Sequence, residues 1–281
     1  EPEVASLQEP STFSDLYIKL IDNGRFHVEI LNWWKSDINI HDHDFSGVQF
    51  QLTGNSLNVK YSFQENESSR KNTLSFGKLN VESAEIWKAG DRSFVRPGIA
   101  EPHTVCHLNV PTVSLLIRTH PTPEYGPQRN YLAPGIAANY GIANSIFRKR
   151  LHALKLLSIS DQSAFQKSFY KMVDFQSDTE TLFTMLKLGE TLFRGNNKKL
   201  LVDYSQRGYK ESKIAQCVVY NRANDFILNQ IKNVLEITDD EQLALSILSA
   251  CHDKKSLIHI LKDTFHQHQQ YHIVVKQVKV F

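Results

Sequence analysis

The hydrophobic period of this chain changes near residue 135, and this change constrains the fold more than any other feature of the sequence. Before that point, short runs alternate apolar and polar residues and are broken by turn signals such as Gly90-Asp91-Arg92. Several alternating runs in succession predict an antiparallel sandwich or barrel. The runs that we expect to form strands are 26–31, 38–43, 48–52, 57–63, 81–87 and 113–117, with a polar hairpin tip at 65–72.

Beyond a proline-rich bridge, apolar residues recur with the 3.6-residue period of amphipathic helices. The sequence Thr238-Asp239-Asp240-Glu241 has the spacing of a capping box and predicts a helix start. The helices that we expect begin near Ile142 and continue at about 161–174, 178–194, 211–235, 239–251 and 254–265. The predicted fold is therefore α+β, with a β-barrel in residues 1–134 followed by a helical domain in residues 135–281, which ends in a strand at 271–281.

The composition excludes several classes of function. The net charge is +2, from 32 basic and 30 acidic residues that are well interspersed, which gives no electrostatic case for nucleic acid or an anionic membrane. No apolar run approaches the roughly 20 residues that span a bilayer. The three cysteines are widely spaced and indicate free thiols in a reducing compartment, so we expect a cytoplasmic protein.

Three histidines carry the strongest chemical signal. His41 and His43 are two residues apart in an alternating run, so both imidazoles should project from one face of a strand. Two such nitrogens leave a divalent transition metal in need of a third ligand. His103 follows the turn at Pro97-Gly98, and an antiparallel neighbouring strand would bring it opposite the pair. His107, four residues later, is the alternative third ligand.

The run from His41 to Gly54 resembles the first motif of the cupin superfamily, whose fold is a β-barrel also described as a double-stranded β-helix. Gly47 stands where that motif has a glutamate ligand. The second motif is matched more loosely, by Gly90, Pro97-Gly98 and His103. The resemblance covers roughly residues 30–120 and implies a metal held by His41, His43 and His103.

Within that superfamily the chain is most similar to the thiol (cysteine) dioxygenases, which hold ferrous iron with three histidines and no carboxylate. They share the His-x-His run with an Asp between, and a later block that resembles Pro111-Thr112-Val113-Ser114-Leu115 here. Two features of that family are missing. Its Ser-His-Tyr accessory residues are replaced at the last two positions by Leu116 and Arg118, and Gly47 or Val48 occupies the position of its thioether-forming cysteine.

The resemblance therefore implies a mononuclear non-haem Fe(II) oxygenase or oxidase that acts with O₂ on a small molecule. Three neutral ligands leave a charge of +2 at the metal, which favours an anionic substrate that binds it directly. Arg118, or alternatively Arg96, is the expected partner of a substrate carboxylate. Gln49 and Gln51 are further candidates if they point inward.

Two other classes of function stay open. Zn, Mn or Ni on the same ligands would suit an isomerase, lyase or hydrolase. A cupin without enzymatic activity would instead sense a ligand. For the helical half we expect a role in homodimer formation or in contact with a peptide or carrier protein.

Overall fold

The computed structural model describes six stretches of the chain, residues 2–9, 14–34, 39–68, 74–139, 145–234 and 238–266. The chain forms two compact units. The first unit comprises residues 1–63, 80–129 and 234–281, and the second comprises residues 64–79 and 130–233. In this division the last described helices belong to the same unit as residues 1–63, and the predicted domain boundary at residue 134 stays a prediction. The predicted α+β class, with strands followed by helices, is confirmed.

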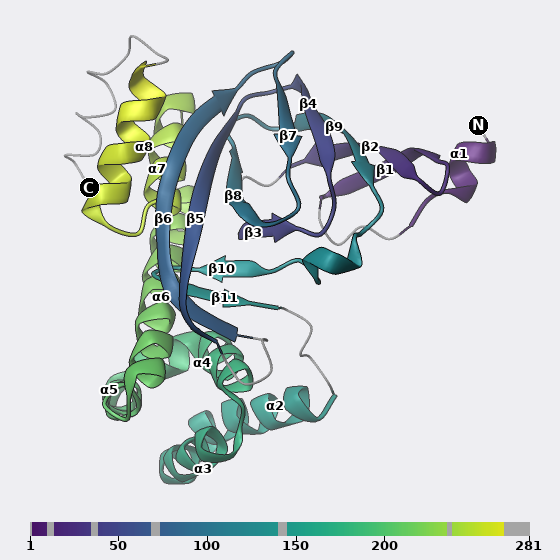
Figure 1. Cartoon of the computed structure of the whole chain (residues 1–281). Helices are drawn as coiled ribbons and strands as arrows, with labels where there is room; N and C mark the ends of the chain where they lie inside the picture. The colour runs from purple at the N-terminus through teal and green to yellow at the C-terminus, as the bar shows by residue number, and fades with distance from the viewer. Residues whose placement is uncertain are drawn as a thin grey trace. The chain divides into compact units, whose positions relative to one another are not determined.

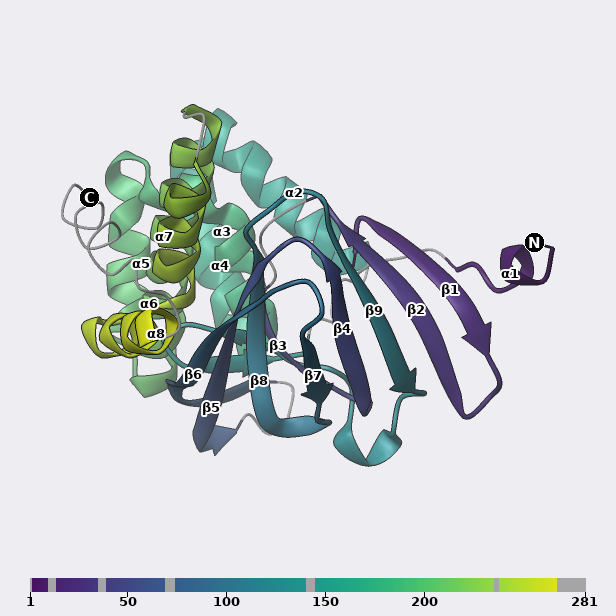
Figure 2. The same ribbon diagram turned by 90° about the horizontal axis from the view of Figure 1, so that it is seen from above.

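A five-stranded sheet forms one wall of the first unit and is preceded by the short helix α1 (Pro2–Ser6). Its strands are paired in the antiparallel order β1-β2-β9-β4-β7 (Figure 2). Their bounds are β1 Leu16–Asp22, β2 Phe26–Trp33, β9 Thr112–Thr119, β4 Gly47–Thr53 and β7 Arg92–Val95.

The second sheet closes into a barrel in the strand order β10-β11-β6-β5-β8-β3. Its bounds are β10 Asn130–Leu132, β11 Ile136–Ala138, β6 Leu74–Trp87, β5 Ser56–Ser68, β8 Gly98–His107 and β3 Ile40–His43. Strands β5 and β6 are long, with 13 and 14 residues, and residues of each belong to both units (Figure 1).

The inner face of the five-stranded sheet follows from the alternation in β2. Every second residue from His27 to Trp33 is buried, whereas Phe26 and the residues between them are exposed or half-buried. Leu31 and Trp33 join Phe45, Val95 and Leu116 in a small apolar core. Because side chains alternate between the two faces of a strand, this core lies on one face of the sheet.

Helices α7 (Asp239–Ala250) and α8 (Lys254–His266) cover part of the barrel strands in the first unit (Figure 1). The Tyr61 hydroxyl of β5 donates a 2.6 Å hydrogen bond to the carbonyl oxygen of Ala250. The backbone N–H of Ala84 donates to the Asp263 carboxylate at 3.0 Å. The predicted capping box at Thr238 is confirmed, since both of its hydrogen bonds are present.

The second unit is a helical bundle built on the ends of three strands. Its helices are α2 Ser145–Ser160, α3 Gln162–Phe175, α4 Asp178–Phe193, α5 Lys198–Ser205 and α6 Tyr209–Val234. One apolar core joins side chains of β6, β10 and β11, such as Phe76 and Ile136, to helix residues such as Phe165, Phe169 and Leu182. Burial of this continuous apolar stripe is what the helical period of the sequence requires.

Most predicted elements are present with shifted ends. The strands β1, β7, β10 and β11 and the helices α1 and α5 were not predicted, and β8 was expected as a neighbour of the His41 strand but without bounds. Two 3-10 turns, Pro123–Tyr125 and Gly195–Asn197, complete the described elements. Residues 65–68 of the predicted hairpin tip belong to β5, which continues to Ser68, and residues 69–72 lie outside the described residues. The predicted strand at 271–281 lies outside the described residues.

Candidate metal centre

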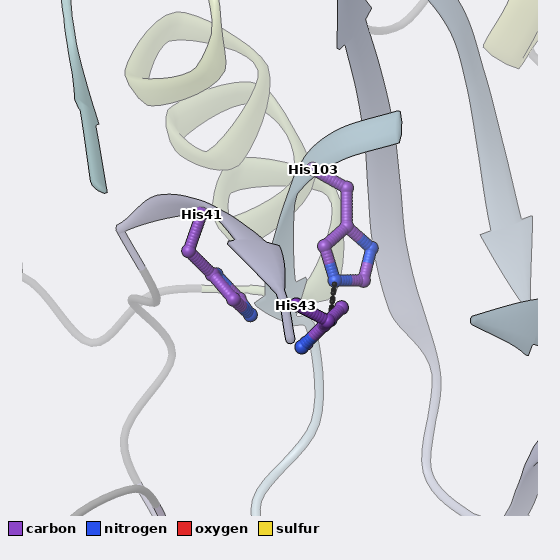
Figure 3. Close-up of side chains that lie close together, drawn as sticks. All are labelled: His41, His43 and His103. Atoms are coloured by element: carbon purple, nitrogen blue, oxygen red, sulfur yellow. Dashed lines mark hydrogen bonds between the residues drawn. The ribbon is translucent and has the colours of Figure 1, made fainter. Parts of the chain in front are cut away.

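Two neighbouring strands place the three histidines. His41 and His43 lie on β3, His103 lies on β8, and the two strands are antiparallel with His41 opposite His103. The register shifts between His41 and His43, which indicates a bulge at this point of the ladder. The three imidazoles converge on one space (Figure 3). The antiparallel neighbour expected for His103 is therefore present.

The imidazoles are close enough to share one ion. One ring nitrogen from each histidine lies within 4.8 Å of the others. His43 Nε2 is 3.0 Å from His103 Nε2. Two nitrogens that bind one ion at about 2.1 Å and at a right angle are about 3.0 Å apart, so this spacing suits adjacent positions of a metal shell.

Hydrogen bonds at the Nδ1 atoms of two rings direct their Nε2 atoms into this space. His41 Nδ1 lies 2.8 Å from the carbonyl oxygen of Asn39, which can only accept a hydrogen bond. His103 Nδ1 lies 2.9 Å from Asn58 Oδ1, while Asn58 Nδ2 donates to the Glu85 carboxylate at 3.0 Å. That carboxylate fixes which end of the Asn58 amide faces His103. Both Nδ1 atoms therefore carry hydrogen, and both Nε2 atoms present lone pairs.

Burial keeps the three rings in the neutral form that binds metals. Their exposed fractions are 2% for His41, 6% for His43 and 9% for His103. Burial lowers the pKa of His41, and it lowers the pKa values of His43 and His103 well below the usual range. His41 and His103 lower the pKa of His43 further, and His41 and Lys60 do the same for His103. The donor set therefore fits a divalent transition metal.

Gly47 leaves no room for the carboxylate of the cupin motif. It lies in β4 between β7 and β9, opposite Val95 and Arg118. A Cβ atom on Gly47 would lie 2.7 Å from the carbonyl oxygen of Ile117 and 3.0 Å from Arg118 Cβ. An acidic side chain at this position would clash with the neighbouring strand, so the fourth ligand of the motif is excluded sterically as well as by the sequence.

A cavity of about 30 Å³ adjoins the three histidines. This volume holds a water molecule or a ligand of similar size. Besides the histidines its walls are mostly apolar, and they comprise Leu31, Trp33, Phe45, Gln49, Val95, Val105, His107 and Leu116. Gln49 thus lies at the cavity, as one of the two glutamine alternatives. Gln51 instead bonds Ser56 Oγ and the carbonyl oxygens of Thr53 and Gly54.

Arg96 lies beside a second, smaller cavity of about 10 Å³, which also reaches His43 and His103. Its guanidinium is 3.4 Å from the Glu101 carboxylate and is largely exposed, at 68%. Lys60 approaches the other oxygen of Glu101 at 3.7 Å. Two cationic side chains and one carboxylate therefore line this approach to the histidines.

Arg118 faces the interior, in step with Ser114 and Leu116 as expected, but it is held by other groups. Its Nε donates a 2.8 Å hydrogen bond to the buried Glu29 carboxylate. Its guanidinium lies 4.4 Å from the centre of the Phe45 ring, and that ring contacts His43. Arg118 is not among the described residues that line the histidine cavity. Its role in holding a substrate stays a prediction.

His107, the alternative third ligand, is placed differently from His103. Its Nδ1 lies 2.9 Å from Ser56 Oγ, and its ring stacks on Trp33 at 4.8 Å. It lines the cavity, but the group of mutually close ligand atoms contains His103. The structure thus brings together His41, His43 and His103.

Sequence reasoning missed Asn58, Lys60 and Glu101 as neighbours of the site. One signal was present, because Asn58, Lys60 and Ser62 are polar residues at alternate positions of a strand that is otherwise strongly apolar. Such a pattern indicates that these polar side chains share one face of the strand. It does not indicate which histidine that face meets.

Comparisons with known proteins give distant structural matches alone. No protein family matches the sequence, and no curated protein matches it. A Neisseria meningitidis protein matches 42% of this chain and 94% of its own, with 13% identity and a TM-score of 0.27. A variant of Bacillus subtilis oxalate decarboxylase matches 43% of this chain and 30% of its own, with 11% identity and a TM-score of 0.30. A structure of DMSP lyases matches 41% and 51%, with 15% identity and a TM-score of 0.28.

Among the described residues, no helix combines the length and apolar composition that crossing a membrane requires.

The geometry of the histidines supports one kind of metal centre. A closed β-barrel with three buried histidines that converge on one space fits a cupin-type metal centre, as the sequence motifs predict.

Proposed function

We propose that this protein is a mononuclear non-haem Fe(II) oxygenase or oxidase that acts on a small anionic substrate. The observation that carries the proposal is the ligand set: three buried, neutral imidazoles, with no carboxylate oxygen among the ligand atoms that the described residues bring together there. Three facial ligands leave adjacent positions open on an octahedral ion, as in related iron oxygenase sites. Ferrous iron bound there would supply the activation of O₂.

The walls of the site support this chemistry. The apolar cavity of about 30 Å³ suits a ligand of the size of O₂ and excludes bulk water. Asn58 and the Asn39 carbonyl hold the His103 and His41 rings at fixed orientations, with their Nε2 atoms available to hold the ion. Gln49 supplies an amide at the edge of this space.

The charge of the site supports an anionic substrate. Three neutral ligands leave the full +2 charge of a ferrous ion, which favours a thiolate, carboxylate or enolate donor. Lys60 and Arg96 lie at the smaller cavity beside His43 and His103, and Glu101 offsets only one of them. We propose Arg96 as the group that pairs with the substrate, with Arg118 as the alternative once its bond to Glu29 is exchanged.

The proposal is tested by purifying the full chain without added metal and measuring its metal content and O₂ consumption. Small thiols and carboxylates serve as candidate substrates. We expect iron at about one equivalent and substrate-dependent O₂ uptake, and we expect both to be lost in His41→Ala and His103→Ala. His259→Ala is the matched control, because His259 is a partly exposed histidine beside a single carboxylate, Asp263, on α8.

Other outcomes would replace the proposal. Zinc, manganese or nickel without O₂ uptake would indicate an isomerase, lyase or hydrolase. Ligand binding without any metal would indicate a sensor. Full iron content in both His41→Ala and His103→Ala would remove the three-histidine site from consideration.

A further inference from the structure

A second group of metal-binding side chains lies on the five-stranded sheet of the first unit. Asp22 is the last residue of β1 and pairs with His27 at the start of β2. His27 pairs on its other side with Arg118 of β9, and His120 directly follows that strand. The β1-β2 hairpin lies beside β9 in the sheet (Figure 2). A carboxylate and two imidazoles from these segments are thus brought together.

The distances among these groups suit one shared ion. One ligand atom of each residue lies within 4.8 Å of the others. His120 Nε2 is 3.1 Å from Asp22 Oδ1, and His27 Nδ1 is 3.7 Å from Asp22 Oδ2. Two ligand atoms held at about 2.1 Å from a tetrahedral ion are about 3.4 Å apart, and the two observed distances lie on either side of this value.

The buried side chain of His27 is the feature that points to a bound ligand. It is 4% exposed, and neither its Nδ1 nor its Nε2 has a hydrogen-bond partner among the described residues. The opposite nitrogen, Nε2, lies 2.8 Å from the buried carboxylate of Glu29. A carboxylate behind a histidine favours hydrogen on the nitrogen that faces it, which leaves the other nitrogen with a lone pair. That lone pair of His27 faces Asp22 at a distance too long for a hydrogen bond.

The protonation states agree with this geometry. Burial lowers the pKa of His27, which favours its neutral ring. The backbone N–H of Gly24 bonds Asp22 Oδ1 and is the largest contribution that lowers the pKa of Asp22, to about 2. A neutral imidazole and an ionised carboxylate are the forms that bind metals.

The charged side chains around this group have a negative net charge, which favours a cation. Lys19 Nζ lies 3.3 Å from Asp22 Oδ2, but it also pairs with Glu9 at 3.1 Å. Arg118 pairs with Glu29. With Asp22, the group holds three carboxylates against two cationic side chains, so its net charge is negative while both histidines are neutral. A divalent ion bound here would therefore meet a negative net charge rather than a positive one.

We propose that Asp22, His27 and His120 form a second metal site, separate from the three-histidine centre, which takes a divalent ion of the zinc class. Two imidazoles and one carboxylate are a ligand set that Zn²⁺ commonly uses. The His120 side chain is 41% exposed, so the site is open to solvent on one side and a water molecule can complete the shell. This proposal does not depend on the proposed activity of the first centre.

Zinc binding by the full chain tests the proposal, with Zn²⁺ alone as the probe. The protein is stripped with a chelator, dialysed against buffered Zn²⁺ and analysed for bound metal. We expect His120→Ala and Asp22→Asn each to bind about one equivalent less than the unmodified chain. His41→Ala should also lose about one equivalent, and the double variant His41→Ala/His120→Ala about two. His120 is partly exposed, so its replacement leaves the fold intact even if replacement of the buried His27 does not.

One variant serves as the control, and one result would contradict the proposal. His259→Ala should keep the full zinc content, because His259 has a carboxylate neighbour 3.4 Å away but belongs to neither group of three ligands. Unchanged zinc content in His120→Ala and Asp22→Asn would overturn the second site. A loss in these variants, with none in His41→Ala, would uphold the second site and remove the first.

Discussion

Replacing Asn58 with leucine tests how the barrel prepares His103 for a metal. Asn58 is fully buried, and its Oδ1 accepts the hydrogen of His103 Nδ1 at 2.9 Å. Leucine has a similar size but no acceptor. In Asn58→Leu the His103 ring loses the bond that keeps hydrogen on Nδ1, and the tautomer with hydrogen on Nε2 then competes with metal binding.

The expected decrease in metal affinity of Asn58→Leu follows from the loss of this one hydrogen bond. Removing such a partner of a metal-binding histidine lowers metal affinity by about 10- to 100-fold. That range corresponds to about 1.4–2.7 kcal/mol of binding free energy. The other contact of Asn58 is to Glu85, which is half-buried, so water can replace it.

The assay is competition for Zn²⁺ against a coloured chelator in chains that also carry His120→Ala, so that the second site does not titrate. Thr264→Val is the control for general loss of stability, because Thr264 is equally buried and its hydroxyl bonds the Ile260 carbonyl within α8. We expect weaker zinc binding in Asn58→Leu and unchanged binding in Thr264→Val. An affinity of Asn58→Leu within about threefold of its parent would refute the reasoning.

Three further predictions concern the fold. Gly47→Glu should lower the free energy of unfolding by about 1–3 kcal/mol, measured by urea denaturation, because its Cβ would lie 2.7 Å from the Ile117 carbonyl oxygen. The substitution should not strengthen metal binding, and tighter zinc binding would contradict this reasoning. Tyr61→Phe should cost about 1–3 kcal/mol in the same assay, since it leaves the Ala250 carbonyl without its 2.6 Å hydrogen bond, and an unchanged midpoint would show that water replaces the hydroxyl. Asp253 has a lowered pKa, chiefly through a backbone hydrogen bond at the start of α8, so its contribution to stability is complete above its unfolded pKa of about 3.8 and is lost as the pH falls through the lower folded value. Asp253→Asn should therefore be less stable than the unmodified chain at pH 6, and the difference should shrink as the pH falls below about 3.8; a difference that stays constant as the pH falls would contradict the assignment.

The central part of the site could be predicted because it depends on local pattern. Side chains two apart on a strand share a face whatever the rest of the chain does, which is why His41 and His43 were expected together. The inward direction of Arg118 follows from the same rule. Its partner Glu29 could not be predicted, because the two residues are 89 positions apart and meet only through the pairing of β2 with β9.

Other features depend on contacts that no local pattern specifies. The bounds of β8 could not be predicted, although a strand with His103 was expected, because Pro102 and the charged Glu101 interrupt the alternation. The helical period of 239–251 indicates that α7 has an apolar face, but it does not indicate which surface covers that face. The second metal group was missed because Asp22, His27 and His120 show no recognisable spacing in the sequence.

The bond between Tyr61 and Ala250 also has a consequence for biosynthesis. Residues 130–233, which belong to the second unit, are translated between the strands of the first unit and the helices α7 and α8. At about 5–20 residues per second, a ribosome needs about 5–20 s to synthesise this stretch. During that interval α7 and α8 have not been synthesised and cannot cover the barrel strands. The apolar residues on that surface of β5 are then accessible to chaperones and can take part in aggregation.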